Sequence, residues 1–367
     1  MKKILFVIGT RPEIIKTAPV IHIFNKDKRY ATKVCFTGQH QAMAIKMIEE
    51  FGIKIDYDLQ LMKPGQSLNY LASAAIRGID SVYEAFGPDM VFLQGDTTTA
   101  FCAALAAFYR RIKVAHIEAG LRTYDKYRPY PEELNRQMVS RVTDIHFAPT
   151  TKAKNNLIQE GVTAGSITVT GNTVIDALFY IKKHKKHFTS KALESLPRNK
   201  QLILVTAHRR ENFGRPLKNI CEALRALAQN NKDIIIVYPV HLNPKVLKPV
   251  RSLLGGIKNI LLIKPLGYSD FVRLMGKAYF ILTDSGGIQE EAPSLGKPVL
   301  ILRDKTERPE VVKAGCAKIV GTNNTKIVKY AQLLLRSKIY YRKMSMKRNP
   351  IGDGRAAIRI KKKVDSV

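Results

Sequence analysis

The sequence alternates short apolar runs with longer helical stretches along its whole length, and this pattern most constrains the fold. The runs are rich in Val and Ile, and most end at a Gly, Asp, Thr or His residue. Continuous apolar strands between helices are typical of parallel sheets that helices cover on both faces. The predicted strands form two series: 3–8, 33–36, 90–93, 113–118, 145–148 and 167–169, then 202–207, 234–239, 260–263, 280–283, 298–302 and 318–320.

Two such series in 367 residues predict two doubly wound α/β domains of ordinary size. The expected seam lies near Gly171, so that 1–171 forms an N-terminal domain and 172–354 a C-terminal domain, followed by a last helix at about 355–367. Ligands of doubly wound domains bind outside the carboxyl ends of the strands. The polar residues that follow each strand are therefore the candidate site residues.

Composition places the chain among globular proteins, with 45% hydrophobic and 25% charged residues. The unusual feature is the formal charge of +31, which attracts polyanions non-specifically. Basic residues are densest at 182–200 and 323–367, but aromatic residues do not alternate with them as in a single-strand binding platform. We therefore interpret these segments as solvated helix faces and predict no specific nucleic-acid partner.

Four widely spaced cysteines form no CxxC pair, which disfavours a zinc ribbon or a thioredoxin-type site. Cysteines this sparse are typical of reduced, buried thiols in a cytoplasmic protein. The apolar start of the chain is interpreted as a first strand rather than a signal peptide, because it becomes charged at once. The longest apolar run, 100–109, is too short to span a bilayer.

The first strand is followed by Gly9-Thr10-Arg11-Pro12-Glu13, and Lys16 lies one turn further on. Pro is favoured in the first turn of a helix, and a helix N-terminus flanked by cations is a natural anion site. The alternative is an ordinary capped helix with surface cations.

Three carboxylates follow strands or open a helix in the first half of the chain: Asp96, Glu118 and Glu132. The strand-end rule brings them to one edge of one sheet, where environments that push pKa values apart provide both an acid and a base. In the alternative, Asp96 and Glu132 cap helices and Glu118 pairs with Arg122. A divalent metal is disfavoured because nearby Arg and Lys residues suit an anionic substrate.

The second half places His208 after its first strand and Asp284-Ser285-Gly286-Gly287 after its fourth. A Ser-Gly-Gly turn that opens a helix leaves N–H groups and the helix dipole free for phosphate. One turn later, Glu290 or Glu291 can accept hydrogen bonds from ribose hydroxyls. Together with the TERPE segment at 306–310, these residues predict a diphosphate site, although a structural histidine and a simple turn remain the alternative.

Missing motifs narrow the chemistry further. The sequence contains no GxGxxG fingerprint, no P-loop, no HExxH zinc site and no GxSxG nucleophile elbow. A nicotinamide-dependent enzyme, a P-loop NTPase, a zinc protease of that type and an α/β-hydrolase are therefore disfavoured.

Seven of these segments, taken in order, carry a family resemblance: GTRPE at 9–13, QGDTTT at 94–99, HIEAGLRT at 116–123, PEELNR at 131–136, HRRENFG at 208–214, DSGGIQEEAPSLGKPVL at 284–300 and TERPE at 306–310. On them the chain resembles the non-hydrolysing UDP-N-acetylglucosamine 2-epimerase family. The resemblance implies a GT-B architecture, with a cleft between two Rossmann-like domains and a final helix that crosses back to the first.

The implied reaction converts UDP-GlcNAc reversibly to UDP-ManNAc, a precursor for envelope polysaccharide. It proceeds by anti elimination of UDP to 2-acetamidoglucal, followed by re-addition on the other face. The resemblance implies no cofactor, no metal and a homodimer.

The resemblance also implies roles for individual residues. Asp96, Glu118 and Glu132 handle protons, and which of them takes which proton stays open. His208 joins the catalytic set and, with other cations and the Ser-Gly-Gly turn, holds the diphosphate. The implied substrate-binding residues are Arg11, Lys16, Arg136, Phe271, Ser285, Gly286, Gly287, Glu291 and Arg308.

Other interpretations stay open. The same chemistry on a modified UDP sugar, 2,3-diacetamido-glucuronate or a 6-deoxy amino sugar, fits the same motifs. A GT-B glycosyltransferase is a more distant alternative. Family members with a second, activating UDP-GlcNAc bind it through a Gln/His-rich turn and an Arg, whereas this chain keeps part of the turn at 39–42 and has Gly65 where the Arg is expected. A weak contact of Lys361-Lys362-Lys363 with an anionic membrane surface is a further hypothesis.

Overall fold

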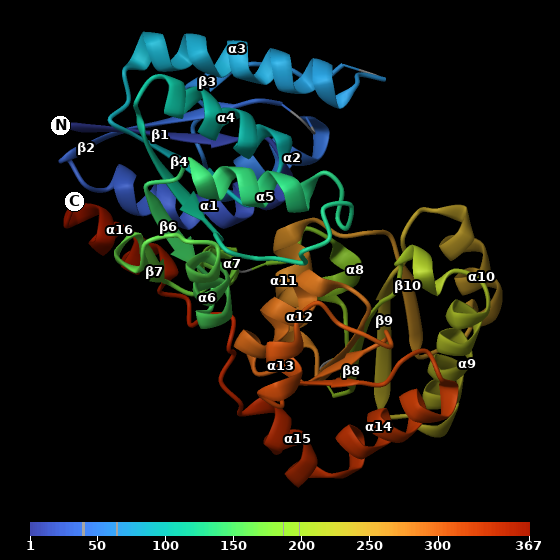
Figure 1. The fold of residues 1–367 in the computed structure, drawn as a ribbon. Helices are drawn as coiled ribbons and strands as arrows, with labels where there is room; N and C mark the ends of the chain where they lie inside the picture. Colours follow the sequence, from blue (N-terminus) through green and yellow to red (C-terminus); the bar gives the residue numbers. More distant parts are fainter. Residues whose placement is uncertain (39–40, 64, 186, 198) are drawn as a thin grey trace. The chain divides into compact units, whose positions relative to one another are not determined.

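The computed structural model describes residues 1–38, 41–63, 65–185, 187–197 and 199–367. The chain divides into two compact units: Met1–Tyr180 together with Gly352–Val367, and Ile181–Ile351. Each unit is a parallel sheet with helices packed against it, which confirms the predicted fold class (Figure 1). The partial match at 39–42 to the activator-binding turn of family members falls partly on 39–40, outside the described residues.

The sheet of the first unit has seven parallel strands in the order β3-β2-β1-β4-β5-β6-β7. The strands are β1 Lys2–Ile8, β2 Tyr30–Phe36, β3 Tyr57–Asp58, β4 Met90–Gln94, β5 Lys113–Ile117, β6 Ile145–Ala148 and β7 Ile167–Val169. Six of them match predicted strands. Sequence reasoning missed β3, because two residues at the edge of a sheet give no apolar run.

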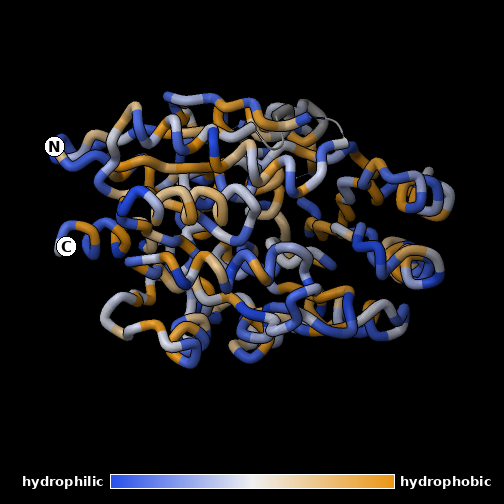
Figure 2. Tube along the Cα trace, turned by 45° about the horizontal axis from the view of Figure 1, so that its top comes forward, coloured by the Kyte–Doolittle hydropathy of each residue, from blue (hydrophilic) through white to orange (hydrophobic). Residues whose placement is uncertain are grey.

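The helices of this unit are α1 Arg11–Asn25, α2 Gln41–Phe51, α3 Leu68–Phe86, α4 Thr98–Tyr109, α5 Glu132–Arg141, α6 Thr151–Gln159 and α16 Ala356–Asp365. Hydroxyl side chains at the N-caps of α3, α4 and α6 accept backbone hydrogen bonds that the first helical turn otherwise leaves unpaired. Strands such as β4 are buried along their whole length. The apolar segments run through the interior of each unit, and hydrophilic ones lie on its outer turns (Figure 2).

The second unit has a six-stranded parallel sheet in the order β10-β9-β8-β11-β12-β13. Its strands are β8 Gln201–Thr206, β9 Ile234–Pro239, β10 Ile260–Ile263, β11 Phe280–Thr283, β12 Val299–Ile301 and β13 Ala317–Ile319, all close to predicted bounds. Its helices are α8 Lys191–Glu194, α9 Arg215–Asn230, α10 Pro244–Leu254, α11 Tyr268–Lys277, α12 Gly286–Glu291, α13 Pro309–Lys313, α14 Asn324–Arg336 and α15 Lys338–Ser345.

The chain leaves the first unit within α7, Thr173–His184, rather than at Gly171. The early turns of α7 stay with the first unit because their apolar side chains, such as Ile175 and Leu178, are fully buried. The seam between the two units therefore falls inside α7, between Tyr180 and Ile181.

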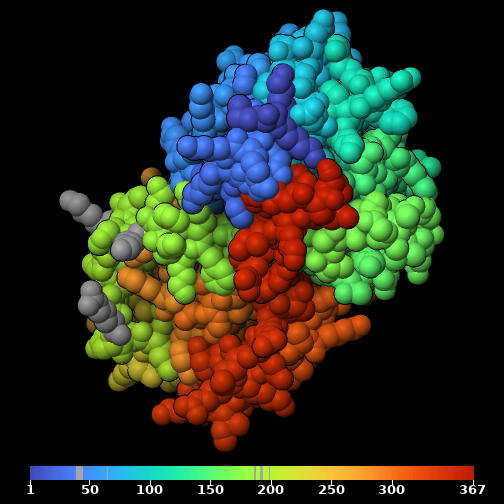
Figure 3. Space-filling model, turned by 90° about the vertical axis from the view of Figure 1, so that its left-hand side faces the viewer, coloured from blue at the N-terminus to red at the C-terminus, as the bar shows by residue number. Residues whose placement is uncertain are grey.

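After residue 351 the chain returns to the first unit, where α16 packs against α1 (Figure 3). Two backbone N–H groups at the start of α16 donate to the Asp176 carboxylate, at 3.1 and 2.9 Å. Gly354 precedes α16 with φ +77°, and a Cβ there would come within 2.3 Å of the Phe179 ring, so this position requires glycine.

Strand order reverses once in each sheet, between β1 and β4 and between β8 and β11. At such a topological switch point the loops after the two central strands leave in opposite directions and open a binding site. The predicted site residues follow these strands or their neighbours.

Candidate functional site

A buried carboxylate connects the two loops at the first switch point. Glu13, in the first turn of α1, accepts hydrogen bonds from the backbone N–H groups of Gly9 and Thr10, at 2.8 and 2.6 Å. Its other oxygen accepts from the Thr97 hydroxyl at 2.5 Å, on the loop after β4. Burial raises the pKa of Glu13, and these hydrogen bonds oppose the rise only in part. Glu13 therefore fixes the loop after β1 to the loop that carries Asp96.

Sequence reasoning named the GTRPE segment but gave Glu13 no role. The available signal was the spacing of Thr10 and Glu13, which is that of a capping box.

Glu118 follows β5 in a left-handed backbone conformation, with φ +67°, and its side chain is buried. Lys16 donates to both of its carboxylate oxygens, at 2.7 and 2.6 Å. The Asn172 amide donates at 2.8 Å, and the Gln94 amide donates to the second oxygen. Sequence reasoning did not predict the contact of Glu118 with Lys16, which it placed at an anion site. The alternative pairing of Glu118 with Arg122 is wrong, because Arg122 binds Glu160 at 2.7 Å.

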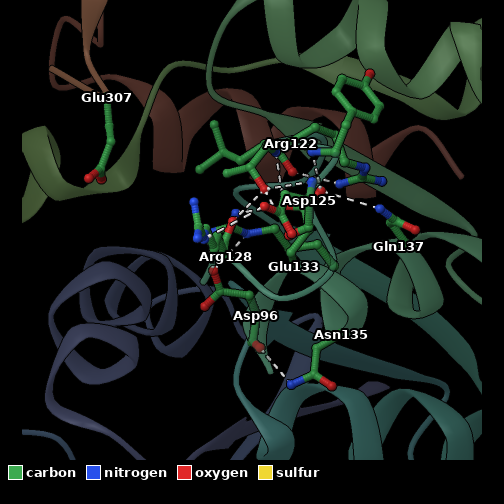
Figure 4. Close-up of polar contacts among 12 residues, drawn as sticks. Asp96, Arg122, Asp125, Arg128, Glu133, Asn135, Gln137 and Glu307 are labelled. Atoms are coloured by element: carbon green, nitrogen blue, oxygen red, sulfur yellow. Dashed lines mark hydrogen bonds and ion pairs between the residues drawn. The ribbon is translucent and has the colours of Figure 1, made fainter. Parts of the chain in front are cut away.

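Asp96 lies after β4 and is held by α5. The Arg136 guanidinium contacts its carboxylate at 2.8 and 2.6 Å, and the Asn135 amide donates to its backbone carbonyl at 2.9 Å (Figure 4). Asp96 does not cap α4, since Thr97 is the N-cap of that helix. The resemblance implied that Arg136 binds the substrate; in the structure its guanidinium holds the Asp96 carboxylate.

Glu133 anchors the loop between β5 and α5. The backbone N–H groups of Thr123 and Tyr124 each donate to it at 3.0 Å, and Arg136 donates at 3.0 Å (Figure 4). Burial alone raises the pKa of Glu133, but these donors outweigh it and bring the pKa below its usual value. Glu133 thus positions the same arginine that holds Asp96.

Glu132 precedes this anchor in the first turn of α5 and is half-buried. Among the residues that the structure describes, it has no hydrogen-bond or ion-pair partner. Its carboxyl group can therefore turn toward a ligand without breaking an existing contact.

His116, on β5, is a buried neutral imidazole. Its Nε2 lies 2.7 Å from the carbonyl oxygen of Gly95, next to Asp96. Burial lowers the pKa of His116 to about 3. The ring therefore donates Nε2–H to Gly95 and fixes the end of β4.

The second switch point uses a buried carboxylate in the same way. Asp284, directly after β11, accepts from the backbone N–H groups of His208 and Arg209, each at 2.8 Å, and from the Asn212 amide at 3.0 Å. Its other oxygen lies 3.8 Å from Nδ1 of His208. The His208 ring is partly exposed and stacks on His241, and burial lowers its pKa despite Asp284. The site histidine is thus placed by an aspartate.

The Ser-Gly-Gly turn begins α12 as predicted. Ser285 is its N-cap, and no side-chain cap occupies the N–H groups of Gly286 and Gly287. Arg308 contacts the buried carboxylate of Glu290, and the Tyr268 hydroxyl donates to Glu291 at 3.0 Å. Glu290 thus positions Arg308.

Two further predicted residues lie at the surface or partly so. Arg11 is exposed at the first position of α1 and has no partner among the described residues. Phe271 is half-buried in α11. Within the described ranges, no group of three or more His, Cys, Asp or Glu side chains is arranged to hold a metal ion.

The sequence matches the family model described as UDP-N-acetylglucosamine 2-epimerase over residues 22–365. The chain belongs to the UDP-N-acetylglucosamine 2-epimerase family. It is therefore an isomerase with two Rossmann-like domains of the GT-B type.

A UDP-N-acetylglucosamine 2-epimerase of Campylobacter jejuni is 52% identical over 98% of this chain and 96% of its own length. The Escherichia coli K12 enzyme of the same name is 49% identical over 98% of this chain and 97% of its own length.

Solved structures agree with this family. The Neisseria meningitidis UDP-GlcNAc 2-epimerase bound to UDP-GlcNAc is 48% identical, with a TM-score of 0.88 over 100% of both chains. A putative UDP-N-acetylglucosamine 2-epimerase of Listeria monocytogenes is 46% identical, with a TM-score of 0.95 over 100% of this chain and 96% of that one.

Proposed function

We propose that this chain interconverts UDP-GlcNAc and UDP-ManNAc by anti elimination of UDP and re-addition of UDP to 2-acetamidoglucal. The observation that carries the proposal is the arrangement at the first switch point. Asp96 and Glu118 follow the neighbouring strands β4 and β5, and Glu132 opens the helix that holds Asp96. Elimination needs a base at C2, and re-addition needs a proton delivered to the opposite face of C2.

The three carboxylates differ in ways that suit different tasks. Lys16 and two amides occupy both oxygens of Glu118, and Arg136 occupies Asp96. Asp96 and Glu118 are thereby fixed in direction, which a proton-transfer group requires. Glu132 is the carboxylate left to turn toward the sugar or the departing oxygen.

Leaving UDP needs stabilisation as its negative charge develops. We assign this role to the N–H groups of Gly286 and Gly287, to Ser285, to the imidazole of His208 and to the guanidinium of Arg308. In the first unit, we also assign phosphate binding to the exposed Arg11 and to Lys16. The Lys16 ammonium donates to both oxygens of Glu118, so it would bind Glu118 and phosphate at the same time. Glu291 binds the ribose and Phe271 packs near the uracil. Loss of this set raises the barrier to C1–O cleavage.

We further propose a cytoplasmic homodimer. Support for the compartment comes from four free, buried thiols, as expected in reducing surroundings. Within the described ranges no helix is long and apolar enough to cross a membrane. Sedimentation equilibrium of the purified chain tests the dimer, and a monomer at micromolar concentration contradicts it.

Proton NMR of the purified protein with UDP-GlcNAc in D2O tests the reaction. We expect UDP-ManNAc with deuterium at C2. Free ManNAc with UDP would show a hydrolase, and UDP binding without turnover would favour a modified UDP sugar.

Asp96→Asn should lower turnover by about a hundredfold or more, since general acid–base catalysis contributes a factor of about 10²–10⁴ to the rate. The matched control is Glu84→Gln, an exposed carboxylate that forms an ion pair with Arg110. Near-normal turnover of Asp96→Asn removes Asp96 from proton transfer.

A further inference from the structure

The chain has a formal charge of +31, and its two units differ in how many of their cations have carboxylate partners. In the first unit, many cations have carboxylate partners, including Lys16, Arg29 and Arg110. Between Glu310 and Asp353 in the second unit, by contrast, the sequence contains no acidic residue. The basic residues of that stretch are Lys313, Lys318, Lys326, Lys329, Arg336, Lys338, Arg342, Lys343, Lys347 and Arg348. They are all exposed, and none forms an ion pair with a described residue.

The helix α15, at 338–345, concentrates this charge on one face. Its buried side consists of Tyr340, Tyr341 and Met344; Tyr341 stacks on Tyr279 at 4.2 Å, and Met344 enters the core of the second unit. Figure 1 draws α15 directly after α14 in this unit, and the two helices are in contact. The helix is therefore firmly attached through one side, and its opposite side faces solvent.

That opposite side combines cations with apolar side chains. Ile339 is 84% exposed and Met346, at the end of the helix, is 78% exposed. At about 100° per residue, Ile339, Arg342, Lys343 and Met346 fall within an arc of about 100°. Exposed aliphatic side chains and unpaired cations are the two kinds of group through which a protein surface binds an anionic lipid membrane.

We propose that the outward face of α15, formed by Ile339, Arg342, Lys343 and Met346 and flanked by Lys338 and Lys347, docks on an anionic lipid surface. The cations contact lipid phosphates, and the two aliphatic side chains enter the headgroup region. The exposed large side chains on this face are aliphatic rather than aromatic, so it lacks the stacking groups that single-stranded nucleic acid uses. The proposal does not depend on the C2 chemistry.

The membrane contact proposed here lies on α15 and not on Lys361-Lys362-Lys363, the segment that the sequence analysis suggested. Lys361 on α16 forms ion pairs with Asp27 and Asp365, both at 2.8 Å, and Lys363 donates to the carbonyl of Gly165 at 3.4 Å. Two of the three lysines first considered are therefore already engaged. The outward face of α15 therefore carries more cations without a carboxylate partner than the lysine segment of α16 does.

Co-sedimentation of the full chain with vesicles tests the proposal. We expect binding to phosphatidylglycerol-rich vesicles at low salt, weaker binding at high salt, and none to pure phosphatidylcholine. Replacing Lys338, Arg342 and Lys343 by Gln should lower the partition coefficient by about a hundredfold, since each cation near an anionic surface adds about 1 kcal/mol. Ile339→Ser with Met346→Ser should lower it by about tenfold through lost apolar burial.

A matched control variant replaces three exposed cations of α10, Lys245, Lys248 and Arg251, by Gln. The change in net charge is identical, but α10 has no exposed large apolar side chain, so we expect less than about a threefold loss. Unchanged epimerase turnover shows that every variant is folded. The proposal is overturned if wild type does not bind anionic vesicles, if the α10 variant loses as much as the α15 variant, or if duplex RNA is bound and vesicles are not.

Discussion

At the first switch point the buried carboxylate comes from a helix, Glu13, and binds the loop after β1, whereas at the second it comes from a strand end, Asp284, and binds the loop after β8. The surroundings differ as well. In the first unit the acids Asp96 and Glu118 are occupied by Arg136 and Lys16 from the same unit. In the second unit, the N–H groups at the start of α12 have no side-chain cap.

Under the proposed function, this difference separates two tasks within one enzyme. Proton transfer needs carboxylates that are held in a fixed direction. Neighbouring cations and amides hold them there, but burying these charges costs desolvation free energy. Binding a diphosphate needs donors that are still free when the ligand arrives. We therefore expect changes at the first switch point to affect stability and catalysis together, and changes to ligand-facing cations to affect affinity alone.

The largest effect is expected from Lys16→Met, which leaves the buried Glu118 carboxylate without its cation. Breaking a buried ion pair in this way costs about 3 kcal/mol. Native-state hydrogen exchange should show the loss in β1, β4 and β5 but not in β8 or β11. The control is Lys54→Met, whose side chain is exposed and 3.7 Å from Asp56. Equal losses in both variants would contradict the distinction between the units.

An intermediate effect is expected from pH. The pKa of His116 is about 3 in the folded chain and about 6.5 in the unfolded one, so the unfolded chain binds the extra proton first as pH falls. Its contribution to stability is complete above pH 6.5 and is lost as pH falls toward 3. At pH 5 the loss is about 2 kcal/mol, since each pKa unit corresponds to about 1.4 kcal/mol.

His116→Gln should remove this part of the pH dependence, as measured by urea unfolding at pH 7.5 and pH 5 while hydrogen exchange follows the first unit. His187→Gln serves as the control because its side chain is 91% exposed. An unchanged pH dependence in His116→Gln would show that another group causes the acid loss.

The smallest effect on stability is expected from Arg11→Ala. This exposed side chain has no partner among the described residues, so unfolding free energy should change by less than about 0.5 kcal/mol. Affinity for UDP, measured by calorimetry, should nevertheless fall by about tenfold, as for a lost charge-assisted hydrogen bond. A large loss of stability would mean that Arg11 is structural.

The local pattern was enough to locate most strands of both sheets. Runs such as Ile234–Pro239 and Phe280–Thr283 are apolar throughout because helices cover both faces of the sheet, so their ends can be identified from sequence. The strand-end rule then selected Asp96, Glu118 and His208. It could not show that Lys16 binds Glu118, because a contact between residues 102 positions apart depends on the order of the strands in the sheet.

Sequence alone determined the parallel α/β class, the two series of strands and the family, because these follow from residue types and their local spacing. The tertiary structure alone decided which side chains hold the acids: Arg136 and Asn135 for Asp96, and Lys16 with Asn172 for Glu118. It also decided that the outward face of α15 carries unpaired charge. The physical reason is that ion pairing and burial depend on neighbours in space, and strand order and helix packing set those neighbours.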